Sequence, residues 1–392
     1  MKNFILIILI IFNCSKLVSQ NCSHPQHNIE IFNEYLTQDN PRLYDWSSAG
    51  YQFGTQALPF VNHTEFHVKD FGAFPNDGIE DRQSIQAAID AATAVGSGLI
   101  SFDPGQYDFY EIFEYGLIIS GSNIVLRGSQ MGETILKQHN RIDGVDFSDR
   151  PNLIVANLNN PQSISNTTIV EDADRYSNTI KVVSSSGISS GDIILIEMRA
   201  PTNPDGSRST ELVDQYSSPL DGTDENGNAY IESNWSNYNT SNPFVFIVAV
   251  KSVDSNTNTL ELVQVLPRNI EVQYNPRVRK IQPRYITEVG VEDLTLEGNY
   301  NEPDWKHHGS WEEDYAWGGI KFDQVYHSWI KNVQFTKILN AVSLVESAYC
   351  TVTDAIIHDT GHFGVRLGQS HNNLVSKITF DDYVHHLSLI HI

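Results

Sequence analysis

The sequence predicts an all-β protein built mainly as a solenoid of stacked β-strand coils. Near the C-terminus, apolar residues return with a spacing of 22 or 23 residues, and many of them are β-branched. Near the N-terminus, an amphipathic stretch that begins after Asp81 has the pattern of a helix that covers something apolar with one buried stripe. A period in the low twenties means that each coil buries its apolar face only by stacking on its neighbours.

Five columns of apolar residues keep one register through the last three coils. Leucine-rich repeats have a similar period, but their Leu-rich consensus is absent. Val291, Leu294 and Leu296 repeat the spacing within one coil, which places an earlier coil there, and Ile124 and Leu126 mark another. The five columns are Ile320/Val342/Val365, Phe322/Leu344/Leu367, Ile330/Val352/Val375, Val333/Ala355/Ile378 and Phe335/Ile357/Phe380.

The composition predicts a folded protein with no nucleic-acid partner. Of 392 residues, 40% are apolar and 10% are aromatic, which is enough to form a core and unlike the composition of disordered chains. Lys and Arg total 25 against 48 Asp and Glu, which gives a net charge of −23. The sequence has no long run of Lys and Arg residues that could release counterions from a phosphate backbone, so nucleic-acid binding is not expected.

The N-terminus has the pattern of a secretory signal peptide over residues 1–20. One Lys precedes nine apolar residues, Phe4 to Phe12, and a polar stretch ends at Gln20. Nine apolar residues are about half of what a transmembrane helix needs, so no transmembrane segment is expected. We expect a protein that is secreted or located in the periplasm or at the cell surface, and a lipoprotein anchored through Cys14 is the less favoured alternative.

The rest of the chain divides into regions that differ in composition and in predicted secondary structure. The polar middle of the central region, 201–242, is expected to be a surface loop or part of a substrate cleft. The last six residues, 387–392, match translated sequencing-adapter DNA, so we expect an artefact at the end of a C-terminally truncated chain. The regions are an N-terminal extension (21–65), the solenoid start with its helix (66–165), an inserted small β-barrel or sandwich (166–285) and further coils (286–386).

A specific resemblance covers the start of the solenoid. The stretch contains DFGA at 70–73, DG at 77–78, IQAAIDAA at 85–92 and FDPGQY at 102–107. This string resembles the opening of secreted pectate-lyase-superfamily proteins, which include rhamnogalacturonase-like and polygalacturonase-like enzymes. DWSSAGY at 45–51 is similar to the preamble of such proteins in polysaccharide-degrading marine bacteria. The resemblance implies a right-handed parallel β-helix with an N-terminal capping helix, and it assigns no catalytic residue to these positions.

The first group of candidate catalytic residues lies in the last coils. Equivalent positions on adjacent coils lie about 4.8 Å apart, so the 23-residue offset is expected to bring His358 beside Asp381. The same offset pairs Asp359 with Asp382 and His362 with His385. Neighbouring carboxyl and imidazole groups can supply an acid and a base. The alternative is that these are solvated turn residues.

Arg366 and a loop before residue 318 are candidates for binding substrate. The guanidinium of Arg366 is suited to a substrate carboxylate or sulfate, with an ordinary salt bridge as the alternative. Trp305, Trp311 and Trp317 offer flat faces for sugar rings, and Glu312 and Asp314 offer carboxylates near them. The alternative is a loop folded back with its Trp residues packed in.

Two further candidates concern anions and metal. Arg277 and Arg279, with Lys280 and Arg284, form the main basic cluster and are suited to a polyanionic glycan, or else they offset acidic neighbours. Residues 221–228 have some features of a Ca²⁺ loop but lack the full alternating ligand pattern. No other cofactor is indicated, and the sequence does not set the oligomeric state.

These observations together predict an exported carbohydrate-active enzyme that degrades an acidic polysaccharide, either pectin-like or a marine polyuronate or sulfated glycan. In β-elimination, His358 or His362 takes the proton next to a uronate carboxylate. In hydrolysis, two carboxylates from Glu312, Asp314 and Asp354 act as acid and base. The partial match of 361–364 (GHFG) to the hydrolases' Gly-His-Gly, and the placing of Asp354 and Asp359, depart from the polygalacturonase pattern. The alternative function is a non-catalytic, glycan-binding or adhesive β-helix.

Overall fold

The computed structural model describes residues 45–112, 115–141, 151–157, 162–199, 202–204, 244–282, 285–299 and 317–386, which belong to one compact unit. No helix among these residues is both long and apolar enough to cross a membrane. Several predicted features lie outside the described residues: the signal peptide, Cys14, the Ca²⁺ candidate 221–228, Arg284, Trp305, Trp311, Glu312, Asp314 and residues 387–392.

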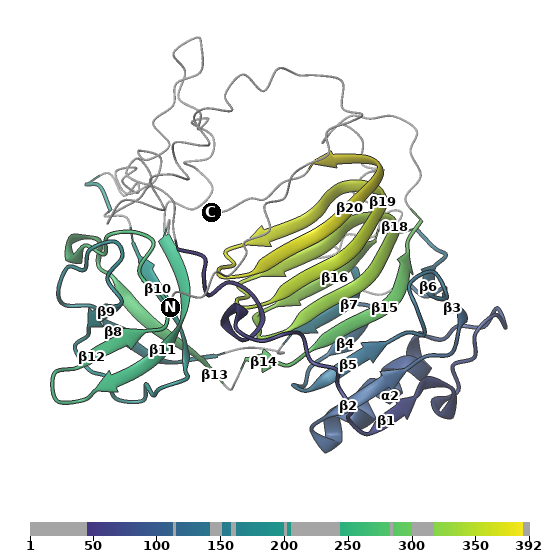
Figure 1. Cartoon of the computed structure of the whole chain (residues 1–392), viewed down its shortest axis with the longest axis horizontal. Helices are drawn as coiled ribbons and strands as arrows, with labels where there is room; N and C mark the ends of the chain where they lie inside the picture. Colours follow the sequence, from purple (N-terminus) through teal and green to yellow (C-terminus); the bar gives the residue numbers. More distant parts are fainter. Residues whose placement is uncertain are drawn as a thin grey trace, which may run out of the picture. The chain divides into compact units, whose positions relative to one another are not determined.

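The main body is a parallel β-helix, as predicted, in which each full coil contributes to three faces. Figure 1 shows the last coils stacked as parallel ribbons. Face A consists of β1 (Glu65–His67), β2 (Gly98–Ser101), β5 (Ile124–Arg127) and the first parts of β15 (Gly290–Glu297), β18 (Trp329–Val345), β19 (Thr351–Gly368) and β20 (Leu374–His386). Face B consists of β3 (Gly105–Phe109), β6 (Thr134–Gln138) and the middle parts of the long strands. Face C consists of β4 (Leu117–Ile119), β7 (Asn152–Asn157), β16 (Gly318–Asp323) and the last parts of β18 and β19.

The predicted apolar columns are the inner ladder of this β-helix. Phe322 lies opposite Leu344 and Leu344 opposite Leu367, while Ala355 lies opposite Ile378. The earlier coil is confirmed too, because Val291 lies between Leu126 and Ile330. The column residues before the last coil form one continuous buried core, against which Val375 and Ile378 pack partly buried, whereas Phe380 is 36% exposed.

Residues in the left-handed backbone conformation form the corner between faces A and B. Asp293, Asn332, Asp354 and Lys377 occupy equivalent positions and have φ between 51° and 59°. Asn and Asp tolerate this backbone better than most residues do. The amide of Asn332 also donates to the carboxylate of Asp293 over 2.6 Å, which ties two corners together. One residue per coil therefore turns a long strand from one face to the next.

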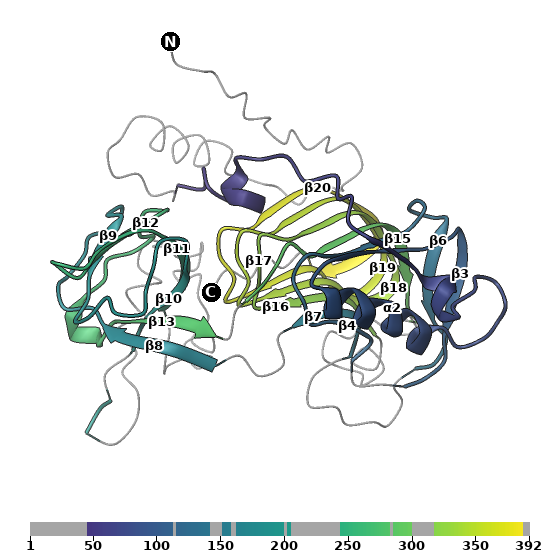
Figure 2. The same ribbon diagram turned by 90° about the horizontal axis from the view of Figure 1, so that it is seen from below.

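The predicted helix is α2 (Arg82–Val95), which packs against β2 and β4 (Figure 2). The amphipathic pattern is confirmed, because Ile85, Ala88, Ile89 and Ala92 form one buried stripe of this helix. Asp81 is the residue before the helix, but its side chain does not cap it. Instead, its carboxylate accepts hydrogen bonds from the backbone of Phe74 and Asp108 and links the helix start to face B.

The central region is a closed antiparallel β-barrel. Its strand order is β8-β13-β10-β11-β12-β9, and an antiparallel bridge between Ile169 and Val182 joins the two outer strands. A barrel, and not a sandwich, is therefore the inserted unit. Its strands are β8 (Gln162–Thr168), β9 (Thr179–Lys181), β10 (Ile193–Met198), β11 (Phe244–Asp254), β12 (Thr259–Leu262) and β13 (Arg277–Gln282).

The barrel packs on the β-helix at the corner between faces C and A. Ile193, Leu195, Ile247 and Ala249 of the barrel contact Tyr326, Ala348 and Tyr349 of the β-helix. The hydroxyl of Tyr349 accepts from the backbone N–H of Ala249 (2.9 Å) and donates to Oε1 of Gln264 (2.5 Å). Tyr326 comes from β17 (Val325–Tyr326), which pairs in parallel with β14 (Ile286–Thr287).

The described end of the N-terminal extension covers part of face A. The ring of Tyr51 meets Trp329 edge-on, with 5.4 Å between ring centroids. Its backbone N–H donates to the hydroxyl of Thr351, and its own hydroxyl donates to Glu288. Trp329 and Thr351 are outward residues of face A, so this part of face A is covered by the chain itself.

Candidate functional site

Face B carries a column of polar and charged side chains on its outer surface. Its members lie in register on successive coils, each about 4.8 Å from the next. Because side chains alternate along a strand, the residues before them, such as Leu136 and Leu296, point into the core. We call this set the charged column: Asp108, Lys137, Glu297, Thr336 and His358, with Asp381 at the next register position.

Charges of opposite sign alternate at the start of the charged column. Lys137 lies directly opposite both Asp108 and Glu297 in the ladder. The Nζ of Lys137 is 3.0 Å from Oε1 of Glu297, and both side chains are about one quarter exposed. The column thus offers the cation of Lys137 and the carboxylate of Glu297 to a chain that lies across the coils.

A histidine–carboxylate pair stands at the end of face B in the first coils. Nε2 of His139 is 2.6 Å from Oδ1 of Asp108. The carboxylate of Asp108 is 4% exposed, and the same oxygen accepts from Nε2 of Gln106. The ring of His139 is 27% exposed. When Nε2 carries the proton and donates it to Asp108, Nδ1 keeps a lone pair, which is the arrangement that a general base needs.

An aromatic ring and a polar network fix the position of His139. The ring of Tyr110 stacks on it with 4.5 Å between centroids and 17° between planes. The next residue, Asn140, donates to the carbonyl of Tyr110 and takes a hydrogen bond from the indole N–H of Trp317. Asn140 is thus tied to the residue that follows β3 and to the residue that precedes β16, and the stacked ring of Tyr110 helps to orient the imidazole.

Trp317 corrects an expectation, because it is not a sugar-stacking platform. Its side chain is 0% exposed and belongs to the core, and its N–H is used by Asn140. A ring inside the core cannot meet a sugar. The residue still matters to the site because it anchors the loop beside His139.

His358 lies where the repeat predicted, at the far part of the charged column. It stands opposite Asp381 and Thr336, and its Nε2 is 3.5 Å from the carboxylate of Asp359. The predicted pairs Asp359–Asp382 and His362–His385 are not in the ladder. The register shifts on either side of Thr360, which pairs with Val384. The ladder resumes only at Phe363 opposite His386, and the His362 side chain lies outside the described residues.

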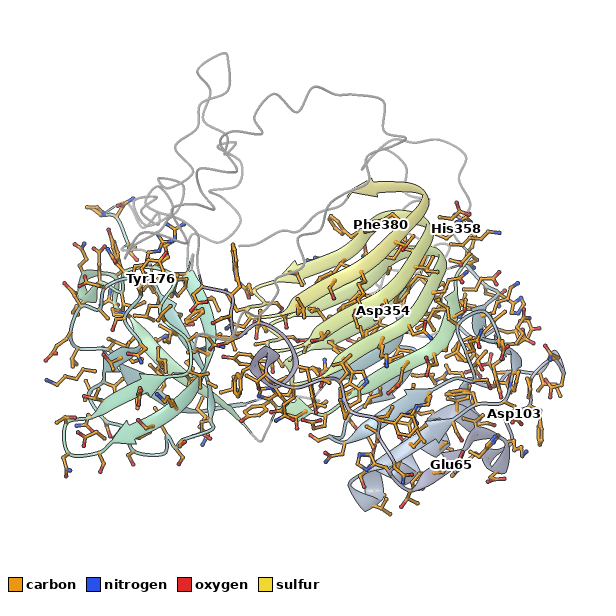
Figure 3. All side chains as sticks on the ribbon, in the orientation of Figure 1. Glu65, Asp103, Tyr176, Asp354, His358 and Phe380 are labelled. Carbon is orange, nitrogen blue, oxygen red and sulfur yellow. The ribbon has the colours of Figure 1, made fainter. Side chains whose placement is uncertain are left out.

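The structure separates Asp354 and Arg366 from His358. Asp354 is a corner residue between faces A and B, and its carboxylate is 3.4 Å from Nζ of Lys377. Figure 3 shows it in the middle of the stacked strands, whereas His358 lies at their curved edge. Arg366 is on face C opposite Ser343, beyond the next corner. His358 and Arg366 therefore lie on different faces, and the grouping of Asp354 with Glu312 or Asp314 stays a prediction, because those two residues lie outside the described residues.

Arg277 and Arg279, the two candidates for binding a polyanionic glycan, contact an acidic neighbour. Both are on β13 of the barrel, and both lie against the buried carboxylate of Glu197 on β10. The carboxylate of Glu197 therefore offsets part of the positive charge of this cluster, and its binding of a polyanionic glycan stays a prediction.

Residues 300–316, which include most of the predicted sugar-binding loop, lie outside the described residues, and Asn299 and Trp317 stand on either side of them in the sequence. Asn299 lies two residues after Glu297, and Trp317 bonds to the residue next to His139. Trp305, Trp311, Glu312 and Asp314 lie between these two points in the sequence. Among the described residues, no group of three or more His, Cys, Asp and Glu side chains is arranged to hold a metal ion.

Comparison with known proteins finds short stretches of strong similarity. No family model matches the chain. The chain is 42% identical over 84 residues to mannuronan C5-epimerase AlgE4 of Azotobacter vinelandii, which covers 21% of this chain and 15% of that protein. It is 40% identical over 84 residues to alginate lyase 7 of the same organism, again 21% of this chain and 10% of the relative. The matches thus span a small part of each relative's length.

Solved structures give broad and weak similarity. The tailspike protein gp49 of Pseudomonas phage LKA1 has a TM-score of 0.48 at 13% identity, covering 80% of this chain and 46% of that chain. The A-module of Azotobacter vinelandii epimerase AlgE4 has a TM-score of 0.36 at 16% identity, covering 80% and 50%. None of these relatives is named as a rhamnogalacturonase or polygalacturonase, so that part of the resemblance stays a prediction.

Proposed function

We propose that this protein acts on an acidic polysaccharide by removing the proton next to a uronate carboxylate, with His139 as the base. The observation that carries the proposal is the 2.6 Å contact between His139 and the buried Asp108, one ladder position from Lys137. The buried carboxylate orients the imidazole and stabilises it when it takes a proton. The names of two relatives, a mannuronan C5-epimerase and an alginate lyase, support a uronate substrate.

The reaction uses the groups of the column in separate roles. Nδ1 of His139 takes the C5 proton, and Lys137 offsets the negative charge that develops on the sugar carboxylate. In β-elimination, the electron pair of the C–H bond forms the C4–C5 double bond, and the glycosidic oxygen leaves with a proton. The phenol of Tyr110, stacked on His139, is the donor for that proton. If a proton instead returns to C5 from the other side, the same first step gives epimerisation.

His358 serves a different sugar unit of the bound chain in this proposal. It is four coil steps from Asp108 in the charged column, which corresponds to about 19 Å. Two bases so far apart cannot act on the same carbon. His358 and Thr336 therefore supply hydrogen bonds along the polysaccharide, and the signal peptide would deliver the protein to where such polymers are found.

The experiment measures proton removal directly. Polymannuronate, polygalacturonate and dextran are each incubated in D₂O, and NMR follows deuterium at C5 while ultraviolet absorbance follows unsaturated uronate. Deuterium or absorbance with a uronate, lost in His139→Gln, is the expected result. The matched control is His67→Gln, which removes another His–Asp pair (3.2 Å to Asp103) at the edge of face A.

A glycan-binding protein without catalysis is the second candidate, and the repetition of polar side chains along one face favours it. Binding of polymannuronate with neither deuterium uptake nor absorbance would establish that function instead. Equal loss of reaction in His67→Gln and His139→Gln would refute the assignment of the base.

A further inference from the structure

We infer that the inserted barrel contains a second anion-binding site, made by Arg199, Arg277 and Arg279 around Glu197, that takes a carboxylate or sulfate group of an acidic glycan. The inference shares its ligand class with the proposed function but not its site. It concerns binding on the barrel, and no catalytic step depends on it.

Strand pairing places the four side chains on one face of the barrel wall. Glu197 of β10 lies directly opposite Arg277 of β13. Residues two apart on a strand project from the same side, so Arg279 and Arg199 join them. Ile193 and Leu195 belong to the same face of β10 and pack on the β-helix, so the arginines continue that face beyond the junction.

The charges of this cluster do not balance. Nε of Arg277 donates to Oε1 of Glu197, Nη2 of Arg199 is 3.4 Å from the same oxygen, and Nε of Arg279 is 3.4 Å from Oε2. The side chain of Glu197 is only 1% exposed. Three guanidinium groups thus surround one buried carboxylate, which leaves an excess of two positive charges in a chain whose net charge is −23.

The arginines keep hydrogen-bond donors that nothing on the described part of the chain uses. Arg277 contacts Glu197 through Nε, which leaves its Nη groups without a hydrogen bond to any described residue. Arg279 makes no hydrogen bond there within normal geometry, and its Nε is buried without a partner, as is that of Arg199. Their side chains are between 22% and 38% exposed, so a ligand can reach them.

These features fit a planar or tetrahedral oxyanion. A guanidinium presents paired N–H groups that match the oxygens of a carboxylate or sulfate. Glu197 holds the three arginines together, so less side-chain entropy is lost when the anion binds. The excess positive charge of the three guanidinium groups is costly where it is partly removed from water. An anion bound on the outer side of the cluster offsets that cost.

The test uses the full chain carrying His139→Gln, so that binding is measured without turnover. Polymannuronate and dextran sulfate are titrated by calorimetry, with dextran as the neutral probe. Arg279→Gln removes one guanidinium group while Arg277 still pairs with Glu197. We expect the anionic polysaccharide to bind about tenfold more weakly to this variant. The control is Lys251→Gln, which makes the same charge change on an exposed residue of the barrel that pairs with Glu261.

A second variant predicts the opposite sign. Glu197→Gln keeps the size of the side chain and raises the local excess of positive charge from two to three, so the anionic probe is expected to bind more tightly. Preference for polymannuronate identifies a uronate ligand, and preference for dextran sulfate identifies a sulfated one. Equal weakening by Arg279→Gln and Lys251→Gln, or no change in Arg279→Gln, would overturn the inference. Because His139 is already replaced, neither result depends on the catalytic proposal.

Discussion

Nε2 of His139 lies 2.6 Å from Oδ1 of Asp108, although the two residues are 31 positions apart in the chain. They meet because β3 and β6 are neighbouring strands of face B, with Asp108 opposite Lys137. The stacking of coils thus turns two distant polar residues into a pair and puts a lysine beside them.

Asp108→Asn is expected to lower kcat on a uronate polymer about 100-fold, while KM changes little. The carboxylate orients His139 and does not touch substrate, so its loss affects the reaction more than binding. The measurement is the initial rate of deuterium uptake at C5. Asp103→Asn is the control, because Asp103 pairs with His67 over 3.2 Å and lies outside the charged column. A parallel rise in KM would contradict a purely positioning role.

The last coils could be predicted residue by residue because their period is constant. Phe335 was expected opposite Ile357, and Ile357 opposite Phe380, and the ladder has both pairs. A parallel coil buries its apolar column at one register, so a fixed spacing in sequence becomes a fixed contact in space. The shift at Thr360 was not predicted, although the spacing between coils changes across it, from 22 residues between Phe335 and Ile357 to 23 between Val342 and Val365.

The site in the first coils was missed for the same physical reason. Asp108 and Lys137 are 29 residues apart, and the whole barrel separates Lys137 from Glu297 in the chain. Neither spacing repeats, so no period in the sequence points to the charged column. One available signal was alternation, since Tyr107 and Phe109 are apolar residues on either side of Asp108. Alternation gives the face on which a side chain lies but not its partner on another strand.

Tyr349→Phe is expected to destabilise the protein by about 2 kcal/mol. The change removes one hydroxyl and leaves two buried groups unpaired, the N–H of Ala249 and the side-chain oxygen of Gln264. Urea unfolding followed by circular dichroism gives the difference in free energy. The control is Tyr326→Phe, also at the barrel junction. The Tyr326 hydroxyl is buried without a partner, so its removal is expected to be neutral or stabilising. Equal losses in the two variants would show that ring packing, and not the hydroxyl, decides the result.

Gly290→Ala is expected to destabilise the β-helix by about 2 kcal/mol, because the added methyl overpacks the wall of face A. A Cβ at Gly290 would lie 2.6 Å from two ring atoms of Trp329. That indole is 1% exposed and bonds to Glu292, so it has no free space to move into. Gly368→Ala is the matched control, since its Cβ would meet nothing closer than 3.9 Å. Thermal unfolding of both variants measures the effect, and equal melting temperatures would contradict it.

His327 is expected to make stability fall in mild acid. Burial lowers the pKa of its imidazole from 6.5 to about 4. Its ring stacks on Tyr349, 5.1 Å between centroids, and meets Phe53 edge-on. Between about pH 6.5 and 4 the unfolded chain binds a proton that the folded protein excludes, so stability is lost as the pH falls. The upper bound of this loss is about 3 kcal/mol below pH 4.

Asp81 changes the stability in the opposite direction to His327 over nearly the same range of pH. Burial raises the pKa of its carboxyl to about 6, so the folded protein binds the proton more readily than the unfolded chain does. Stability from this group therefore rises as the pH falls from about 6 to 3.8, and it partly cancels the effect of His327.

His327→Asn keeps a residue that tolerates the left-handed backbone there, φ 47°, and removes the imidazole. Urea midpoints measured from pH 7 to pH 4.5 should then rise toward acid relative to the unmodified protein. If the two pH profiles run parallel, the buried imidazole does not control the acid response.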